Sequence, residues 1–233
     1  MNIKNKLLPL LIATASLAAA GCDSASESPY SPGGGESSGT NIPSQKNFVV
    51  LFDEPNPPVI DTDGFYNGGV EVEVSIHAAD RYHLATTGAT AYIDVDWGTL
   101  SATSCQIQSS GSCSVTWTSN ANFDPEFFPA DELITFTAWI MGEESFADVN
   151  GNGVFDDGDV FTNDSDGPFL DLNHDGAYTA GTDKILYPGN AAGTLTPANG
   201  LFDGPDCGHS SLCSGASAIY ISDRAILSIR EAP

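Results

Sequence analysis

Hydrophobic and polar residues alternate along much of the chain. The clearest example is the segment 70–76, whose apolar members are Val70, Val72, Val74 and Ile76. Successive side chains of a strand point to opposite faces, so this alternation predicts a strand buried on one face. The other segments that predict strands are 91–97, 113–118, 133–141 and 218–229, with 48–52 as an additional edge strand. Clusters of Gly, Pro, Asn and Ser separate them, which indicates an all-β fold, an antiparallel β-sandwich.

An acidic segment departs from this pattern between Glu143 and Asp183. It contains eleven carboxylates and no Lys or Arg. Ionised carboxylates that lie close together repel one another, so the segment needs a cation to become compact. Oxygen-bearing side chains at alternating positions favour Ca²⁺ over Zn²⁺ or copper.

The spacing within this segment matches a calcium loop. In the twelve-residue loop, side chains at positions 1, 3, 5, 9 and 12 and the carbonyl at position 7 surround the ion, and Gly at position 6 makes the turn. The first copy turns at Gly153, and its ligands are Asp148, Asn150, Asn152, the Val154 carbonyl, Asp156 and Asp159. The second copy turns at Gly176, and its ligands are Asp171, Asn173, Asp175, the Ala177 carbonyl and Asp183.

Both copies depart from the pattern at their last position. Asp159 stands where the loop usually has a bidentate Glu, and a shorter acid predicts a weaker site. In the second copy Thr179 and Thr182 hold positions 9 and 12, so Asp183 comes one residue late. We expect two calcium ions or more as cofactors. The alternative is a solvated acidic segment whose Asn-Gly pairs form turns.

These loops resemble those of dockerins and of thrombospondin type 3 repeats, which share the DxNxNGxxDxxD form. In dockerins a helix follows each loop. Here the segment 160–168 follows the first loop, and it has no helical periodicity and ends in Pro168. The helix-free, stacked type of loop is therefore the closer comparison, and a dockerin's binding to cohesin is not implied.

The amino terminus predicts export and lipid anchoring. Residues 1–21 combine a basic start with a short apolar run, which indicates a signal peptide. Small residues before Cys22 resemble the bacterial lipobox, and this implies acylation of Cys22. The segment 22–46 is rich in Ser, Gly and Pro and predicts a flexible tether. We expect a lipid-anchored, extracytoplasmic protein of the bacterial cell envelope, in either the inner or the outer membrane.

Charge and cysteine content agree with this location. The formal net charge is −24, which argues against nucleic acid and anionic lipid headgroups as partners. Cys22 apart, four cysteines remain and allow three connectivities. Short intervening loops favour disulfides between neighbours, namely Cys105 with Cys113 and Cys207 with Cys213. The competing interpretation is a zinc site, with His209 as the nearby imidazole.

Two motifs resemble bacterial Ig-like domains of the invasin and intimin type. They are Gly98-Thr-Leu-Ser101 and the segment 111–119, which parallel a "GTLS" element and a hairpin ending in "VTLTS". The resemblance covers residues 60–141 and implies an Ig-like sandwich, whose full extent we place at residues 47–233. In this scheme 143–215 is an insertion before the final strand, and the calcium loops project from one end of the sandwich.

The resulting hypothesis is a calcium-stabilised Ig-like envelope or surface protein that is not an enzyme and works in adhesion or extracytoplasmic assembly. The first alternative is a module that binds carbohydrate or protein through exposed aromatic rings. The candidate rings are Trp139, Phe146, Phe155, Phe161, Phe169, Tyr178 and Tyr187. The second alternative is a polysaccharide hydrolase, whose candidate carboxylate pairs are Glu143 with Glu144 and Asp94 with Asp96. The Glu pair is poorly suited because neighbours on a strand face opposite ways.

Overall fold

The computed structural model describes residues 39–62, 66–120, 132–191 and 193–232. The chain divides into the units Met1–Ser31 and Pro32–Pro233, and all described residues belong to the second. The predicted signal peptide, the predicted lipidation site Cys22 and most of the predicted tether lie outside the described residues. Among the residues that are described, no helix is long and apolar enough to cross a membrane.

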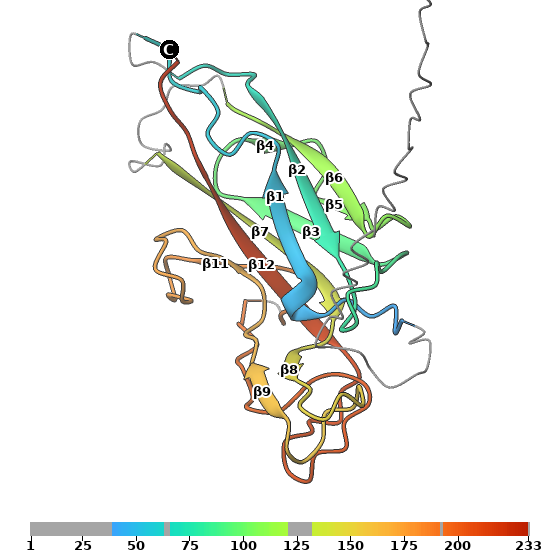
Figure 1. Ribbon diagram of the computed structural model, residues 1–233. Helices are drawn as coiled ribbons and strands as arrows, with labels where there is room; N and C mark the ends of the chain where they lie inside the picture. The colour runs from blue at the N-terminus through green and yellow to red at the C-terminus, as the bar shows by residue number, and fades with distance from the viewer. Residues whose placement is uncertain (1–38, 63–65, 121–131, 192, 233) are drawn as a thin grey trace, which may run out of the picture. The chain divides into compact units, whose positions relative to one another are not determined.

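Two four-stranded antiparallel sheets form a sandwich (Figure 1). The first sheet has the order β1 (Phe48–Phe52), β2 (Glu71–Ala78), β6 (Ser112–Thr118) and β4 (Thr99–Leu100). The second has the order β12 (Ile219–Ser228), β7 (Leu133–Gly142), β3 (Thr90–Val95) and β5 (Ser104–Gln106). A 3-10 turn, η1 (Gln45–Asn47), precedes β1. The predicted all-β sandwich is therefore confirmed.

The strand order resembles that of an immunoglobulin-type sandwich, except that β5 pairs with β3 although it follows β4 in the chain. Such a fold places strands A, B, E and D in one sheet and C, F and G in the other. Here β1-β2-β6-β4 corresponds to the first set, and β3, β7 and β12 correspond to the second. The connection between the last two strands carries the acidic insertion.

Alternation along the strands builds the core between the sheets. Val72, Val74 and Ile76 of β2 are buried, while Glu71 and Glu73 are exposed, as the pattern predicts. At the centre, Phe136 of β7 is fully buried, and its ring centroid lies 4.9 Å from that of Phe52. These contacts join the two sheets through side chains that alternate inward.

Strand β7 is buried on both faces. It pairs with β12 from Leu133 opposite Ser228 to Gly142 opposite Ile219, so the two strands run side by side (Figure 1). Residues 134 to 140 are all buried. A strand covered on both sides carries apolar residues on both faces, and in β7 Thr135 and Thr137 interrupt this run. Part of the insertion supplies the outer cover.

The insertion contains two small hairpins. β8 (Ser145–Ala147) pairs with β9 (Val160–Asn163), and β10 (Phe169–Leu170) pairs with β11 (Lys184–Ile185). The second hairpin lies on the outer face of β7, where Trp139 packs against Leu170 and Leu186. The expectation that both loops project from one end of the sandwich is therefore wrong for the second loop. The apolar outer face of β7 offers it a surface to bury.

Both predicted disulfides are present. Cys105 is bonded to Cys113 and Cys207 to Cys213, with Cα atoms 5.9 and 5.8 Å apart. The cysteines are therefore not zinc ligands. The first disulfide links β5 to β6 and thus one sheet to the other, and the second closes a short loop within the insertion.

We predict that Phe136→Ala lowers the free energy of unfolding by about 3–5 kcal/mol, since it leaves a cavity between the sheets. Ile226→Ala is the matched control, because Ile226 lies on the neighbouring strand β12 and its side chain is exposed. That change should cost less than about 0.5 kcal/mol. Urea unfolding of the two variants measures the difference. Equal losses would contradict the placement of the core.

Candidate metal-binding loops

Each predicted calcium loop is the turn of one small hairpin. The first loop, 148–159, connects β8 to β9, and the second, 171–183, connects β10 to β11. Strands therefore follow both loops, and neither is followed by a helix. Pairing of the flanking strands holds the first and last residues of each loop together. This placement brings the first acid of each loop close to its last.

The first acid of each loop accepts hydrogen bonds from the backbone of the turn. Asp148 accepts from the N–H groups of Gly151, Asn152 and Gly153, with distances of 2.7, 3.2 and 2.7 Å. Asp171 accepts from the N–H of Gly176 at 2.8 Å. In both loops, the carboxylate at position 1 thus binds the N–H of the turn glycine at position 6.

The last acid has the same partners in both loops. Asp159 accepts from the N–H of Val149 at 2.8 Å and of Asp156 at 3.0 Å, which are positions 2 and 9. Asp183 accepts from Leu172 at 2.9 Å and Thr179 at 2.6 Å, again positions 2 and 9. The turn before Asp183 therefore accommodates the extra residue of the second loop. The Asp183 carboxylate accepts from the same two loop positions as the Asp159 carboxylate.

The backbones turn at the same positions. At position 4, Gly151 and His174 have φ angles of 73° and 57°. At position 6, Gly153 and Gly176 have φ angles of 77° and 82°. Position 11 is also a glycine with positive φ in each loop. Position 4 of the second loop places a non-glycine residue in the left-handed region, which is sterically unfavourable for most side chains.

The intermediate candidate ligands converge. Asn150 and Asn152 both donate to the carboxylate of Asp156, at 3.0 and 2.7 Å. In the second loop, Asn173 and Thr179 donate to Asp175 at 2.9 and 3.2 Å. The N–H of position 7 is also held in each loop. Val154 donates to Asn152 at 2.7 Å, and Ala177 donates to Asp175 at 2.8 Å. Side chains at positions 3, 5 and 9 therefore meet in both loops.

The second loop contains a buried carboxylate oxygen without a donor. The Asp171 side chain is 7% exposed, and its Oδ1 has no hydrogen-bond partner among the described residues. A buried charged oxygen is costly unless a donor or a cation satisfies it. Within the described ranges, no three His, Cys, Asp or Glu side chains are grouped so that they could hold a metal ion by themselves. A site in these loops would therefore need amide and carbonyl oxygens as well, which Ca²⁺ accepts.

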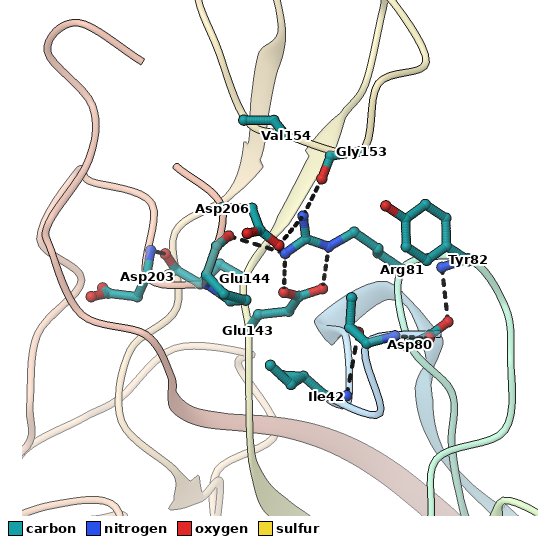
Figure 2. A network of polar contacts seen from close by, with 12 residues as sticks. Ile42, Asp80, Arg81, Tyr82, Glu143, Glu144, Gly153, Val154, Asp203 and Asp206 are labelled. Carbon is teal, nitrogen blue, oxygen red and sulfur yellow. Dashed lines mark hydrogen bonds and ion pairs between the residues drawn. The ribbon is translucent and has the colours of Figure 1, made fainter. Parts of the chain in front are cut away.

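An arginine of the sandwich anchors the first loop (Figure 2). Arg81 is buried and forms a bidentate ion pair with Glu143, the first residue of the insertion. The same guanidinium donates to the carbonyl of Gly153 and, at 3.1 Å, to that of Pro205. The sequence did not predict this junction. The only signal was that Arg81 is the last basic residue before Lys184.

Glu143 and Glu144, the first candidate carboxylate pair, are both buried and held by protein contacts. Glu143 is held by Arg81, and Glu144 accepts from the N–H groups of Ser165 and Asp203 at 2.7 and 2.8 Å. Burial raises the pKa of Glu144 to about 7, although the two backbone hydrogen bonds oppose this rise. The contacts account for both carboxylates as parts of the junction between sandwich and insertion.

The other carboxylate pair is split between two environments. Asp94 forms an ion pair with Lys184 at 2.6 Å. Asp96 accepts from the N–H of Thr135 at 3.0 Å, and its side chain is 11% exposed. Asp96 is therefore largely buried, whereas Asp94 is partly exposed. The second loop covers Asp96, since the Nε2 of His174 lies 3.8 Å from Asp96 Oδ2.

Most candidate aromatic rings are buried. Trp139, Phe146, Phe155 and Phe169 are buried, while Tyr187 is 80% exposed. Phe155, at position 8 of the first loop, packs against Phe146 and Phe202, with ring centroids 5.3 and 5.0 Å away. The Phe155 ring also stacks on His209. These rings form a small core beneath the first loop, which favours a structural role over a binding platform.

Comparison with known protein families, with curated proteins and with solved structures finds no match for this chain.

We predict that stability falls as pH rises from about 5 to 7.5 because of Glu144. Its folded-state pKa lies above that of an unfolded glutamate, so the folded state holds the proton more tightly. The resulting stability is present at low pH and is lost as pH rises through about 7. Glu144→Gln should remove up to about 3 kcal/mol of this dependence. The measurement is urea unfolding across this pH range in EGTA.

Glu71→Gln is the control for this experiment, because Glu71 is exposed on β2. It should retain the pH dependence of the unmodified protein. A Glu144→Gln variant whose stability follows pH with the same slope as the unmodified protein would contradict the assignment.

Proposed function

We propose that this protein is a lipid-anchored Ig-like module of the bacterial envelope whose acidic insertion is ordered by two calcium ions. One ion is bound in each hairpin loop. The module is not an enzyme and works in adhesion or extracytoplasmic assembly. Calcium supplies the positive charge that the insertion lacks, so that metal binding and ordering of the insertion are coupled.

The observation that carries this proposal is the common arrangement of two loops that differ in length and sequence. Asp148 and Asp171 bind the turn, and Asp159 and Asp183 each bind positions 2 and 9. Similarity of sequence does not by itself impose these shared hydrogen bonds, because the second loop is one residue longer than the first. A shared requirement to surround an ion explains why both backbones take one form.

Electrostatics support the same proposal. The stretch 143–183 contains eleven carboxylates, and its closest basic partners come from outside it. They are Arg81, which pairs with Glu143, and Arg224, which pairs with Asp171. Lys184 does not belong to this set, because its partner Asp94 lies outside the stretch. Much of the negative charge stays unbalanced by these contacts. Extracellular modules bind Ca²⁺ with dissociation constants of about 10⁻⁴–10⁻³ M, so external calcium would keep the insertion ordered.

The location rests on the amino-terminal sequence together with the disulfides. The pairs Cys105–Cys113 and Cys207–Cys213 fit an oxidising compartment outside the cytoplasm. Lipidation at Cys22 would anchor the module to a membrane through the tether 22–46. A protein or carbohydrate ligand is the partner expected for such a module.

The test is thermal unfolding of the soluble chain Ser24–Pro233, which contains the whole unit Pro32–Pro233, in EGTA and in 10 mM Ca²⁺. With dissociation constants near 10⁻⁴ M, each ion contributes about 2.7 kcal/mol. The melting temperature should therefore rise by roughly 10–20 °C. Asp148→Ala should lose about half of this rise, and Asp148→Ala with Asp171→Ala should lose all of it.

Glu71→Ala, which removes an exposed carboxylate of the sandwich, should keep the full rise. A melting temperature that is the same in EGTA and in Ca²⁺ would overturn the proposal, and the acidic segment would then be a solvated insertion.

A further inference from the structure

An arginine from the sandwich contacts each loop at the same place. Arg81 donates to the carbonyl of Gly153, and Arg224 of β12 donates to the carbonyl of Gly176 at 3.2 Å. Both glycines hold position 6 of their loops. Each guanidinium also lies over the phenylalanine that comes two residues before the first acid. The distances to the ring centroids are 5.4 Å for Phe146 and 4.3 Å for Phe169.

The two arginines differ in how their charge is balanced. Arg81 forms a bidentate pair with the buried carboxylate of Glu143, which is not a candidate ligand, and Asp206 Oδ2 lies 4.0 Å away. The charge of Arg81 is therefore compensated outside the first loop. Arg224 has its ion pair with Asp171 itself, with Nη1 3.9 Å from Oδ2. That aspartate holds position 1 of the second loop.

Other basic side chains near the second loop are directed elsewhere. Lys184 follows the closing acid Asp183, but its amine pairs with Asp94 at 2.6 Å. His174 lies against Asp96. Within the part of the chain that the structure describes, Arg224 is thus the basic side chain that pairs with a candidate ligand of the second loop, and its side chain is 33% exposed. A partly desolvated charge at this distance is screened less than one in open water.

We propose that Arg224 is a built-in counter-cation of the second loop, which stabilises the loop without calcium and weakens its affinity for calcium. The inference rests on the proposed calcium binding and adds that the two sites are unequal. The first loop fills at lower calcium concentration, and the second fills later. Arg224 lies near Asp171 Oδ2. The other oxygen, Oδ1, is buried and has no donor among the described residues, so it remains available to the ion.

The direction in which one substitution changes the calcium affinity of the second loop distinguishes this role from a purely structural one. Arg224→Gln removes the positive charge and retains N–H groups that can donate to Gly176. If Arg224 only braces the loop, this change weakens calcium binding or leaves it unchanged. If Arg224 competes with the ion, calcium binding at the second loop becomes tighter, by about three- to tenfold at low salt. The same variant should melt at a lower temperature in EGTA.

The experiment is calorimetric titration of Ser24–Pro233 with CaCl₂ in 50 mM and in 500 mM NaCl. An Asp148→Ala background disables the first loop, so that the heat reports the second. The gain from Arg224→Gln should shrink at 500 mM NaCl, because salt screens the repulsion. Arg230→Gln is the control for total charge, since Arg230 donates to the carbonyls of Asn56 and Glu231 and to neither loop. It should change the affinity by less than twofold.

The outcomes separate the two proposals. An Arg224→Gln variant that binds calcium no more tightly than its parent overturns the counter-cation role while calcium binding stands. The counter-cation role is also overturned if the unmodified chain binds one ion and the Asp148→Ala variant binds none, because the second loop would then bind no calcium. No binding by the unmodified chain overturns the proposed function itself. A comparison with the first loop intact provides a second measurement, in which only the weaker of two binding steps should tighten.

Discussion

The structure of the insertion depends on how its negative charge is compensated. Arg81 lies in the connection between β2 and β3, Arg224 lies on β12, and each donates to the position-6 carbonyl of one loop. Arg81 also pairs with Glu143, where the chain leaves β7. These two contacts tie the acidic segment to the sandwich. Two arginine side chains do not neutralise the negative charge of this segment. The remaining charge is the physical reason for proposing calcium in the loops.

Strand β7 connects the sandwich to this charged segment. Its inner face contributes Phe136 to the core, and its outer face carries Trp139, which the second hairpin covers. Thr137 also donates from β7 to the carbonyl of Phe169 at 3.0 Å. The second loop is therefore held by apolar burial and hydrogen bonds as well as by Arg224. Strand β7 therefore contributes both to the packing of the sandwich and to the contacts that hold the second loop.

The sequence predicted those features that depend on local pattern. Alternation located β2, β3, β6 and β12 to within about two residues, since burial on one face imposes period two. Loop spacing predicted which residues converge, because neighbours in a turn meet wherever the turn is placed. It also included Asp183, although position 12 is Thr182. The short hairpin strands around the loops were not predicted, because two to four residues carry too little periodicity.

What the sequence could not supply was long-range pairing. The partners Arg81 and Glu143 are separated by 62 positions, and no local pattern relates them. The position of the second hairpin on β7 was missed for the same reason, as was the cover over Asp96. Each depends on which surfaces remain unburied after the sandwich forms, and this is decided only in three dimensions.

The most direct test of the central claim is an anomalous difference map from crystals of Ser24–Pro233 grown with Tb³⁺ in place of Ca²⁺. The account predicts one peak inside each loop. Asp148, Asp159 and the Val154 carbonyl should surround the first peak, and Asp171, Asp183 and the Ala177 carbonyl the second. Loops that keep the Asn150–Asp156 and Asn173–Asp175 hydrogen bonds, with no peak in either at saturating ion, would contradict it.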